Sequence, residues 1–190
     1  MYEGFIGLTE RVAMLNLILH EFKISIIQVY APTESAKEEE IEEFDKTIEK
    51  AMEITHKNII LMGDFNAKVG APKEGEYLIV HQHGDGERND RGQRLVDYAL
   101  EHNLTIINTC FKKNRSRRWT WRSPNGQHKN EIDYILSNQP KLFNNFEVLN
   151  LNYPSDHRLI RSTLKIAKQK QSKTETNGHL WASLEEAFTQ

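Results

Sequence analysis

The chain has 190 residues, which at about 150 residues per domain predicts one domain followed by a tail. Its 25 basic and 27 acidic side chains nearly cancel, which excludes a wholly basic nucleic-acid coat protein and an acidic disordered chaperone. The chain is 38% hydrophobic and 27% charged, as expected of an ordinary globular protein with a core of its own.

Cysteine usage and hydropathy predict the compartment. The single cysteine, Cys110, excludes an intramolecular disulfide and suits a reducing environment. The most apolar N-terminal stretch, residues 12–19, is far shorter than the ~20 residues that span a bilayer, and no small-residue cleavage site follows it. We expect an intracellular protein, nuclear or cytoplasmic, that is neither secreted nor membrane-bound.

The first third of the chain predicts two strands, a helix and a third strand. Residues 12–19 and 24–30 are rich in Val, Leu and Ile and predict buried strands, with a tight turn at residues 21–23. Residues 35–54 have apolar side chains at three- and four-residue spacing, which predicts an amphipathic helix. Its glutamates form either the wet face of that helix or an acidic interaction surface. The apolar run 58–62 predicts a strand buried on both faces.

The rest of the chain predicts an α/β domain spanning residues 1–166, with a core of sheet on sheet. A Gly-, Pro- and His-rich stretch predicts a long surface loop at residues 70–86, and a second helix is expected from Asp90 to Leu100. Further strands are expected at residues 104–110, 119–121, 132–136 and 161–166. Residues 167–190 have the composition of a polar linker and tail.

Asp64 and Asn66 follow the buried strand directly, in the string MGDFNA. Polar residues at the carboxyl end of a buried strand lie on the rim of the sheet, where sites of α/β proteins are usually found. Their alternate spacing points both side chains the same way if the backbone stays extended. The other interpretation is an Asx turn that only caps the loop.

A second group contains a histidine and two carboxylates. Asp156 and His157 are neighbours in SDH, so they would serve different parts of one site, or they lie in an ordinary exposed loop. Asp133 lies inside the apolar string EIDYIL, where an unpaired carboxylate is costly, so it requires a histidine or a metal as its partner. Tyr30, at the end of its strand, is either core filling with a wet hydroxyl or a donor to a phosphate.

The segment from Lys112 to Lys129 has seven basic residues and no acidic one, with tryptophans interleaved. This local excess favours binding to a polyanion, because arginine contacts phosphates and an indole stacks on a base. The alternative is a solvated hairpin with its tryptophans packed inward. The candidate nucleic-acid contacts are Arg115, Arg117, Arg118, Trp119, Trp121 and Arg122.

Six strings in order resemble the endonuclease/exonuclease/phosphatase superfamily, and among its members the apurinic-like endonucleases of RTE-type non-LTR retrotransposons and the craniofacial-development-protein-2-like proteins. They are IIQVYAPT, LMGDFNAKVG, NDRGQRL, RRWTWRSPNG, NEIDYIL and SDHRL. The resemblance covers residues 12–166. It implies a four-layer α/β/β/α sandwich and cleavage of a phosphodiester that depends on Mg²⁺ or Mn²⁺, with DNA as partner and no small-molecule cofactor.

The resemblance also implies a role for each matching residue. Asp64 would orient or deprotonate the attacking water, and Asn66 would hold a phosphate oxygen. His157, backed by Asp133, would stabilise charge on the phosphoryl group. Asp156 would lie near the metal. Tyr30 would contact the phosphate, and Asn89 would line the same cleft.

The family pattern has a segment that this sequence does not match. Family members carry an Asn and the principal Mg²⁺-binding Glu on strands that precede the region matched from Val12. We therefore expect a domain missing its opening strands, weak or absent nuclease activity, and self-association through an exposed sheet edge. The alternatives are a catalytically dead relic that binds nucleic acid or protein, and a small-molecule phosphatase of the same superfamily.

Overall fold

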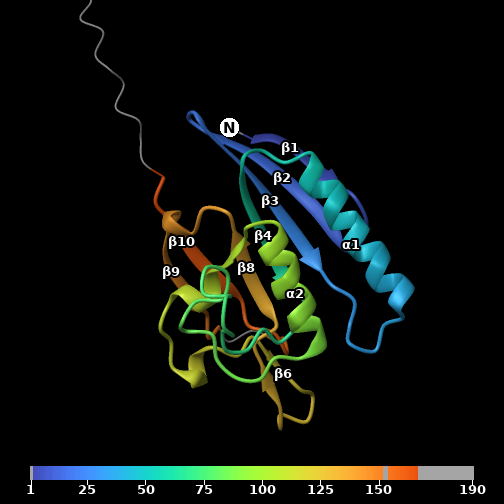
Figure 1. Cartoon of the computed structure of the whole chain (residues 1–190), viewed down its shortest axis with the longest axis vertical. Coiled ribbons are helices and arrows are strands. Elements are labelled where there is room, and N and C mark those ends of the chain that lie inside the picture. The colour runs from blue at the N-terminus through green and yellow to red at the C-terminus, as the bar shows by residue number, and fades with distance from the viewer. Residues whose placement is uncertain (1, 152–153, 167–190) are drawn as a thin grey trace, which may run out of the picture.

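The computed structural model describes residues 2–151 and 154–166, so the expected tail at 167–190 lies outside the described residues. Six strands form a mixed sheet in the order β1-β2-β3-β4-β8-β5 (Figure 1). Only β3 and β4 run parallel to each other. The strands are β1 (Tyr2–Gly7), β2 (Val12–Leu19), β3 (Phe22–Tyr30), β4 (Asn58–Asp64), β8 (Asp133–Ser137) and β5 (Thr105–Ile106).

The predicted hairpin of β2 and β3 is confirmed, but its turn comes earlier in the chain than the expected residues 21–23. Lys23 pairs with Ile18 inside the ladder, so the turn consists of His20 and Glu21. His20 adopts a left-handed backbone with φ +60°. Strand β1 was not predicted, because its six residues include two glycines and lack a clear alternation. It forms one edge of the sheet, and self-association there stays a prediction.

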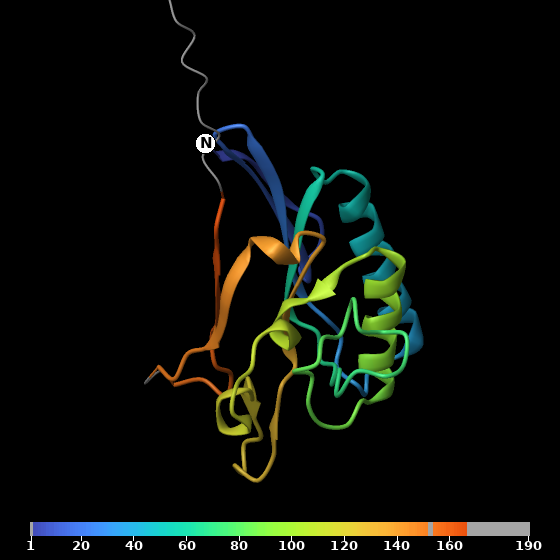
Figure 2. The same ribbon diagram turned by 60° about the vertical axis from the view of Figure 1, so that its left-hand side comes forward.

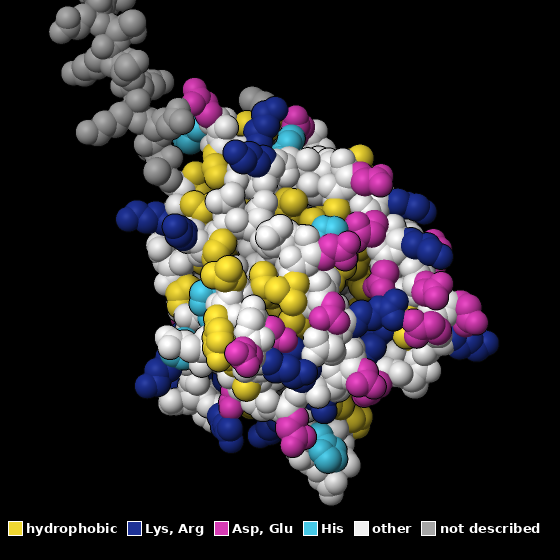
Figure 3. All heavy atoms as spheres, viewed as in Figure 1, with side chains coloured by type: hydrophobic (Ala, Val, Ile, Leu, Met, Phe, Trp, Pro, Cys, Tyr) yellow, Lys and Arg dark blue, Asp and Glu magenta, His cyan; other side chains and the backbone are white. Residues whose placement is uncertain are grey.

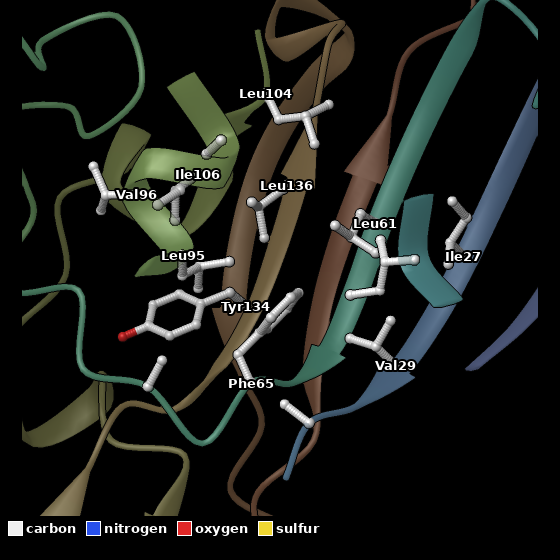
Figure 4. Close-up of a cluster of buried hydrophobic side chains, with 14 of the residues drawn as sticks. Ile27, Val29, Leu61, Phe65, Leu95, Val96, Leu104, Ile106, Tyr134 and Leu136 are labelled. Atoms are coloured by element: carbon white, nitrogen blue, oxygen red, sulfur yellow. The ribbon is translucent and has the colours of Figure 1, made fainter. Parts of the chain in front are cut away.

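Two helices cover one face of the sheet: α1 (Glu38–Glu53) and α2 (Asp90–Glu101). The predicted apolar face of α1 is confirmed, with Ile41, Phe44 and Ile48 buried. Its acidic side chains point outward along the right-hand edge of Figure 3. The core between helices and sheet includes Leu61 and Tyr134 (Figure 4).

The opposite face of the sheet carries a second, smaller sheet, as the sheet-on-sheet prediction requires. Strands β9 (Phe143–Val148) and β10 (Ile160–Leu164) pair antiparallel and form a layer on the far side of the sheet from the helices (Figure 2). Their apolar side chains pack against the sheet. The described residues thus form the helix layer, the main sheet and part of a second sheet of the expected four-layer sandwich.

The strand expected at residues 104–110 is wrong in its second half. After β5 the chain forms a 3₁₀ helix, Ile107–Cys110. The reason is that side chains replace the backbone hydrogen bonds of a strand there. Thr109 Oγ1 donates to the Ile106 carbonyl (2.6 Å), and the Asn108 side chain bonds the backbone of β8.

Two short strands, β6 (Trp121–Arg122) and β7 (Lys129–Asn130), form a hairpin that projects from the end of the main sheet (Figure 1). Of the strand expected at residues 119–121, only Trp121 belongs to a strand. None of the helices among the described residues is long and apolar enough to cross a lipid bilayer, and the nuclear or cytoplasmic location stays a prediction.

The loop predicted at residues 70–86 is part of a longer one, residues 65–89, between β4 and α2. A buried ion pair holds it in place. The Arg88 guanidinium donates to both carboxylate oxygens of Glu76 (2.6 Å each) and to the carbonyls of Val69 and Ala71. Helix α2 packs directly on this loop at Gly92. Any larger residue would clash there, since an added Cβ would lie 1.8 Å from the Lys68 carbonyl oxygen. The loop is therefore fixed beside the ends of β3 and β4.

Candidate active site

Three of the predicted site residues lie in one row across neighbouring strands. Tyr30 on β3 is in register with Asp64 on β4, and Asp64 is in register with Asp133 on β8. Side chains at paired positions lie on the same face of a sheet, about 5 Å apart at their Cβ atoms. The row stands at the end of the sheet, on the face opposite the helices, because Leu61 and Tyr134 alternate onto the helix side.

His157 approaches this row from the segment between β9 and β10. Its Nδ1 lies 3.1 Å from Asp133 Oδ2, and because a carboxylate only accepts, the imidazole donates there. Its Nε2 lies 3.9 Å from Asp64 Oδ2. The requirement that Asp133 have a partner is thus met by the histidine, and the imidazole stands between two carboxylates.

The site's electrostatics follow from this arrangement. Burial raises the pKa of Asp64 from 3.8 to about 6, and the neighbouring Asp133 and Asp156 act in the same direction. The hydrogen bond from the Asn66 amide and the charge of His157 oppose this rise. The hydrogen bond to Asp133 raises the pKa of His157, and burial of the ring opposes it. Above pH 6 Asp64 is therefore mostly ionised, and the neighbouring carboxylates favour the protonated form of His157.

Asn66 forms the Asx turn that was the second interpretation of the MGDFNA string. Its backbone N–H donates to Asp64 Oδ1 (2.9 Å), which is the Asx turn, and its φ of +48° means that the backbone is not extended. Its side-chain Nδ2 donates to the Ala31 carbonyl (2.8 Å), which fixes the amide. Asn66 and Asp64 nevertheless line the same hollow.

That hollow collects most of the predicted catalytic residues. Asn89 lines it as expected and also caps α2, because its Oδ1 accepts from the backbone amides of Gly92 and Lys68 (2.9 Å each). The residues lining the hollow are Tyr30, Thr33, Glu34, Asp64, Asn66, Lys68, Asn89, Trp121, Asn130, Ile132, Asp156 and His157. Lys68, Glu34 and Asn130 were not predicted, although Lys68 stands only two residues after Asn66.

The side chains of Asp156 and His157 have different partners. Asp156 Oδ2 accepts from the indole Nε1 of Trp121 (3.0 Å), while His157 contacts the carboxylates of the sheet. Among the described residues, the group whose donor atoms lie within 4.8 Å of one another consists of Asp64, Asp133 and His157. The expected position of Asp156 near a metal stays a prediction.

The predicted basic contacts divide into paired and exposed residues. Arg118 is buried and forms an ion pair with Glu131, with Nε 3.0 Å from Oε2. Arg115 is exposed and binds both carboxylate oxygens of Asp85 (2.6 and 2.7 Å). The side chains of Arg117 and Arg122 are exposed.

Trp119 is neither fully packed inward nor fully exposed, and a cation stacks on it. The Arg158 guanidinium lies 3.3 Å from its ring centroid, and the Lys129 ammonium lies 5.0 Å from it. Arg158 was not predicted, although it directly follows His157. Trp119 and Lys129 line two further hollows, of which one shares Lys68 with the central hollow and the other shares His157.

Comparison with known proteins places this geometry in a family. A family model described as endonuclease-reverse transcriptase matches residues 24–161. The chain belongs to the endonuclease-reverse transcriptase family. The match includes every candidate catalytic residue, and the resemblance carried by the six strings is confirmed.

Other proteins are similar to this chain in sequence or in fold. The chain is 39% identical over 120 residues to craniofacial development protein 2 of Bos taurus; the match covers 62% of this chain and 20% of the relative, so the chain spans about a fifth of that protein. The endonuclease domain of TRAS1, a telomere-specific non-LTR retrotransposon, superposes with a TM-score of 0.61 and 17% identity over 87% of this chain and 70% of its own.

A second solved structure shows the same fold. The 3′ phosphatase NExo from Neisseria, bound to a product DNA hairpin, superposes with a TM-score of 0.57 and 19% identity. The superposition covers 82% of this chain and 65% of the Neisseria chain. At these identities the likeness establishes the endonuclease/exonuclease/phosphatase fold.

Proposed function

We propose that this chain hydrolyses phosphodiester bonds within DNA at the hollow lined by Asp64 and His157, with Asp133 hydrogen-bonded to the imidazole. The observation that carries the proposal is the imidazole of His157 placed between two carboxylates, 3.1 Å from Asp133 and 3.9 Å from Asp64. One carboxylate orients the ring and stabilises its cationic form, while the other is free to act on water.

Each group has a task in such a hydrolysis. Asp64, ionised above pH 6, accepts a proton from the water whose oxygen attacks the phosphorus. His157, held by Asp133, supplies positive charge at Nε2 to the non-bridging oxygens as the bond to the leaving oxygen breaks. Asn66, fixed by its bond to Ala31, has a second side-chain N–H to offer to a phosphate oxygen.

A divalent cation fits the donor set at this site. Asp64, Asp133 and the deprotonated imidazole of His157 would hold it, because their ligand atoms lie within 4.8 Å of one another. The ion would then replace the positive charge that the protonated ring supplies in its absence. Two carboxylates suit Mg²⁺ or Mn²⁺, and the imidazole shifts the preference toward Mn²⁺. When bound, the cation would supply positive charge to the phosphate in the transition state.

The surroundings favour a polymeric anion over a small phosphate ester. Two further hollows adjoin the central site and share Lys129; one also contains Lys68, and the other contains Arg122 and Arg158. A strand of DNA has further phosphates to place beside these basic side chains, whereas an isolated phosphate group has none. The likeness to the TRAS1 endonuclease domain supports internal cleavage of a nucleic acid. The likeness to NExo, which is bound to a product DNA hairpin, supports DNA and makes loss of a 3′ phosphate a second candidate.

A labelled oligonucleotide distinguishes these two activities. We expect a DNA duplex labelled at its 5′ end, with a phosphate at its 3′ end, to be shortened by internal cuts when Mn²⁺ is added. Removal of only the terminal phosphate would instead favour the phosphatase. Binding without either product would contradict hydrolysis and leave nucleic-acid binding as the function.

A further inference from the structure

Thr120 lies between the two segments that bring Asp133 and His157 together. It precedes β6, is fully buried (0% exposed), and stands between the two partly exposed tryptophans, Trp119 and Trp121. Because it has no exposed surface, its side chain offers nothing to a substrate. Its hydrogen bonds therefore have to explain what it does.

The Thr120 hydroxyl holds the backbone at the start of β8. Its Oγ1 accepts from the backbone amides of both Ile132 (3.0 Å) and Asp133 (3.1 Å). A hydroxyl oxygen has two lone pairs, so these two donors use its full capacity as an acceptor. The Thr120 amide also donates to the carbonyl of Asn130 (2.9 Å), so the contact extends over four residues of this segment.

The backbone of the same residue holds the segment that carries the histidine. The amide of Arg158 donates to the Thr120 carbonyl (2.7 Å), and Trp121 forms a β-bridge with His157. One residue thus bonds the backbone amide of Asp133 on one side and the residue next to His157 on the other. On its other side, Asp133 is held by Asn108, whose Nδ2 donates to the Asp133 carbonyl (3.0 Å).

We propose that Thr120 is a positioning residue that sets the contact between Asp133 and His157. Asp133 Oδ2 and His157 Nδ1 lie 3.1 Å apart, and they belong to segments 24 residues apart in the chain. Removal of the hydroxyl leaves two backbone amides without their acceptor, so the start of β8 is free to move relative to His157. A displacement of about 1 Å in a catalytic group is enough to slow a reaction about 100-fold.

The substitution Thr120→Val tests this, because valine keeps the shape of the side chain and cannot accept a hydrogen bond. We expect the amides of Ile132 and Asp133 to exchange with solvent faster, and the NMR signal of the His157 Nδ1 proton to weaken or disappear. Thr120→Ser restores the acceptor, so both signals should return. The matched control is Thr47→Val, which removes a buried hydroxyl of α1 that donates to the Glu43 carbonyl (2.7 Å).

The activity readout rests on the proposed function, and the NMR readout does not. For cleavage of DNA we expect Thr120→Val to lower the single-turnover rate about 100-fold with unchanged DNA affinity, and Thr120→Ser to restore it. A folded Thr120→Val protein with an unchanged His157 Nδ1 signal would overturn the positioning role. An inactive wild-type protein whose NMR signals still respond as expected would overturn the hydrolysis and leave the positioning intact.

Discussion

Replacing Asp64 with asparagine should stop phosphodiester cleavage and at the same time make the protein more stable. The pKa of Asp64 is raised from 3.8 to about 6, so the folded state favours the protonated form. The contribution of protonated Asp64 to the free energy of unfolding is therefore fully present below pH 3.8 and is lost as pH rises through 6. At pH 7.5, without added divalent cations, the Asp64→Asn protein should gain about 1 to 3 kcal/mol in its free energy of unfolding.

Denaturant unfolding between pH 4 and 8 measures this effect. The difference between the wild type and Asp64→Asn should be small at pH 4 and reach its full size above pH 6. The control is Asp97→Asn on the exposed side of α2, where we expect little change at any pH. An Asp64→Asn protein that is less stable than the wild type at pH 7.5 would mean that the ionised carboxylate stabilises the fold.

Arg117 and Arg118 are neighbours in the sequence, and their substitutions should have different effects. Arg118 is buried against Glu131, so Arg118→Ala leaves an uncompensated carboxylate inside the protein. We expect it to lower the free energy of unfolding by about 3 to 5 kcal/mol. Arg117 is exposed, so Arg117→Ala should change stability by less than about 0.5 kcal/mol.

DNA binding separates the same two variants. If Arg117 contacts a phosphate, Arg117→Ala should weaken binding at all sequences and reduce the dependence of log K on log salt by about one unit. Thermal unfolding and fluorescence anisotropy, measured over a range of salt concentrations, give both quantities. A stable Arg118→Ala protein with weakened DNA binding would contradict the structural role of the buried pair.

The candidate site residues could be picked out from the sequence because they lie at or within strong strand signals. Asp64 follows an apolar run, and Asp133 stands inside one, so burial and the need for a partner are both visible in the sequence. The sequence could not show that Asp64 and Asp133 are paired across β4 and β8. That register is set by contacts between two strands that are 68 residues apart in the chain, with other elements in between.

The division of the basic segment could not be predicted for the same reason. Whether Arg118 is exposed depends on Glu131, thirteen residues away, and on how the chain folds back between them. Strand β1 and the 3₁₀ helix after β5 were also not predicted. The first is paired despite its glycines, and the second exists because Asn108 and Thr109 satisfy the backbone through side chains.

The measurement that tests the hydrolytic centre most directly is nicking of supercoiled plasmid DNA in the presence of Mn²⁺. The wild type should nick the plasmid, and a metal chelator should stop it. His157→Ala and Asp133→Asn should each lower the rate by about 10² to 10⁴, since each removes part of the same charge arrangement. Nicking that persists unchanged in both variants, or a folded wild type that binds the plasmid and never cuts it, would contradict a hydrolytic site at Asp64, Asp133 and His157.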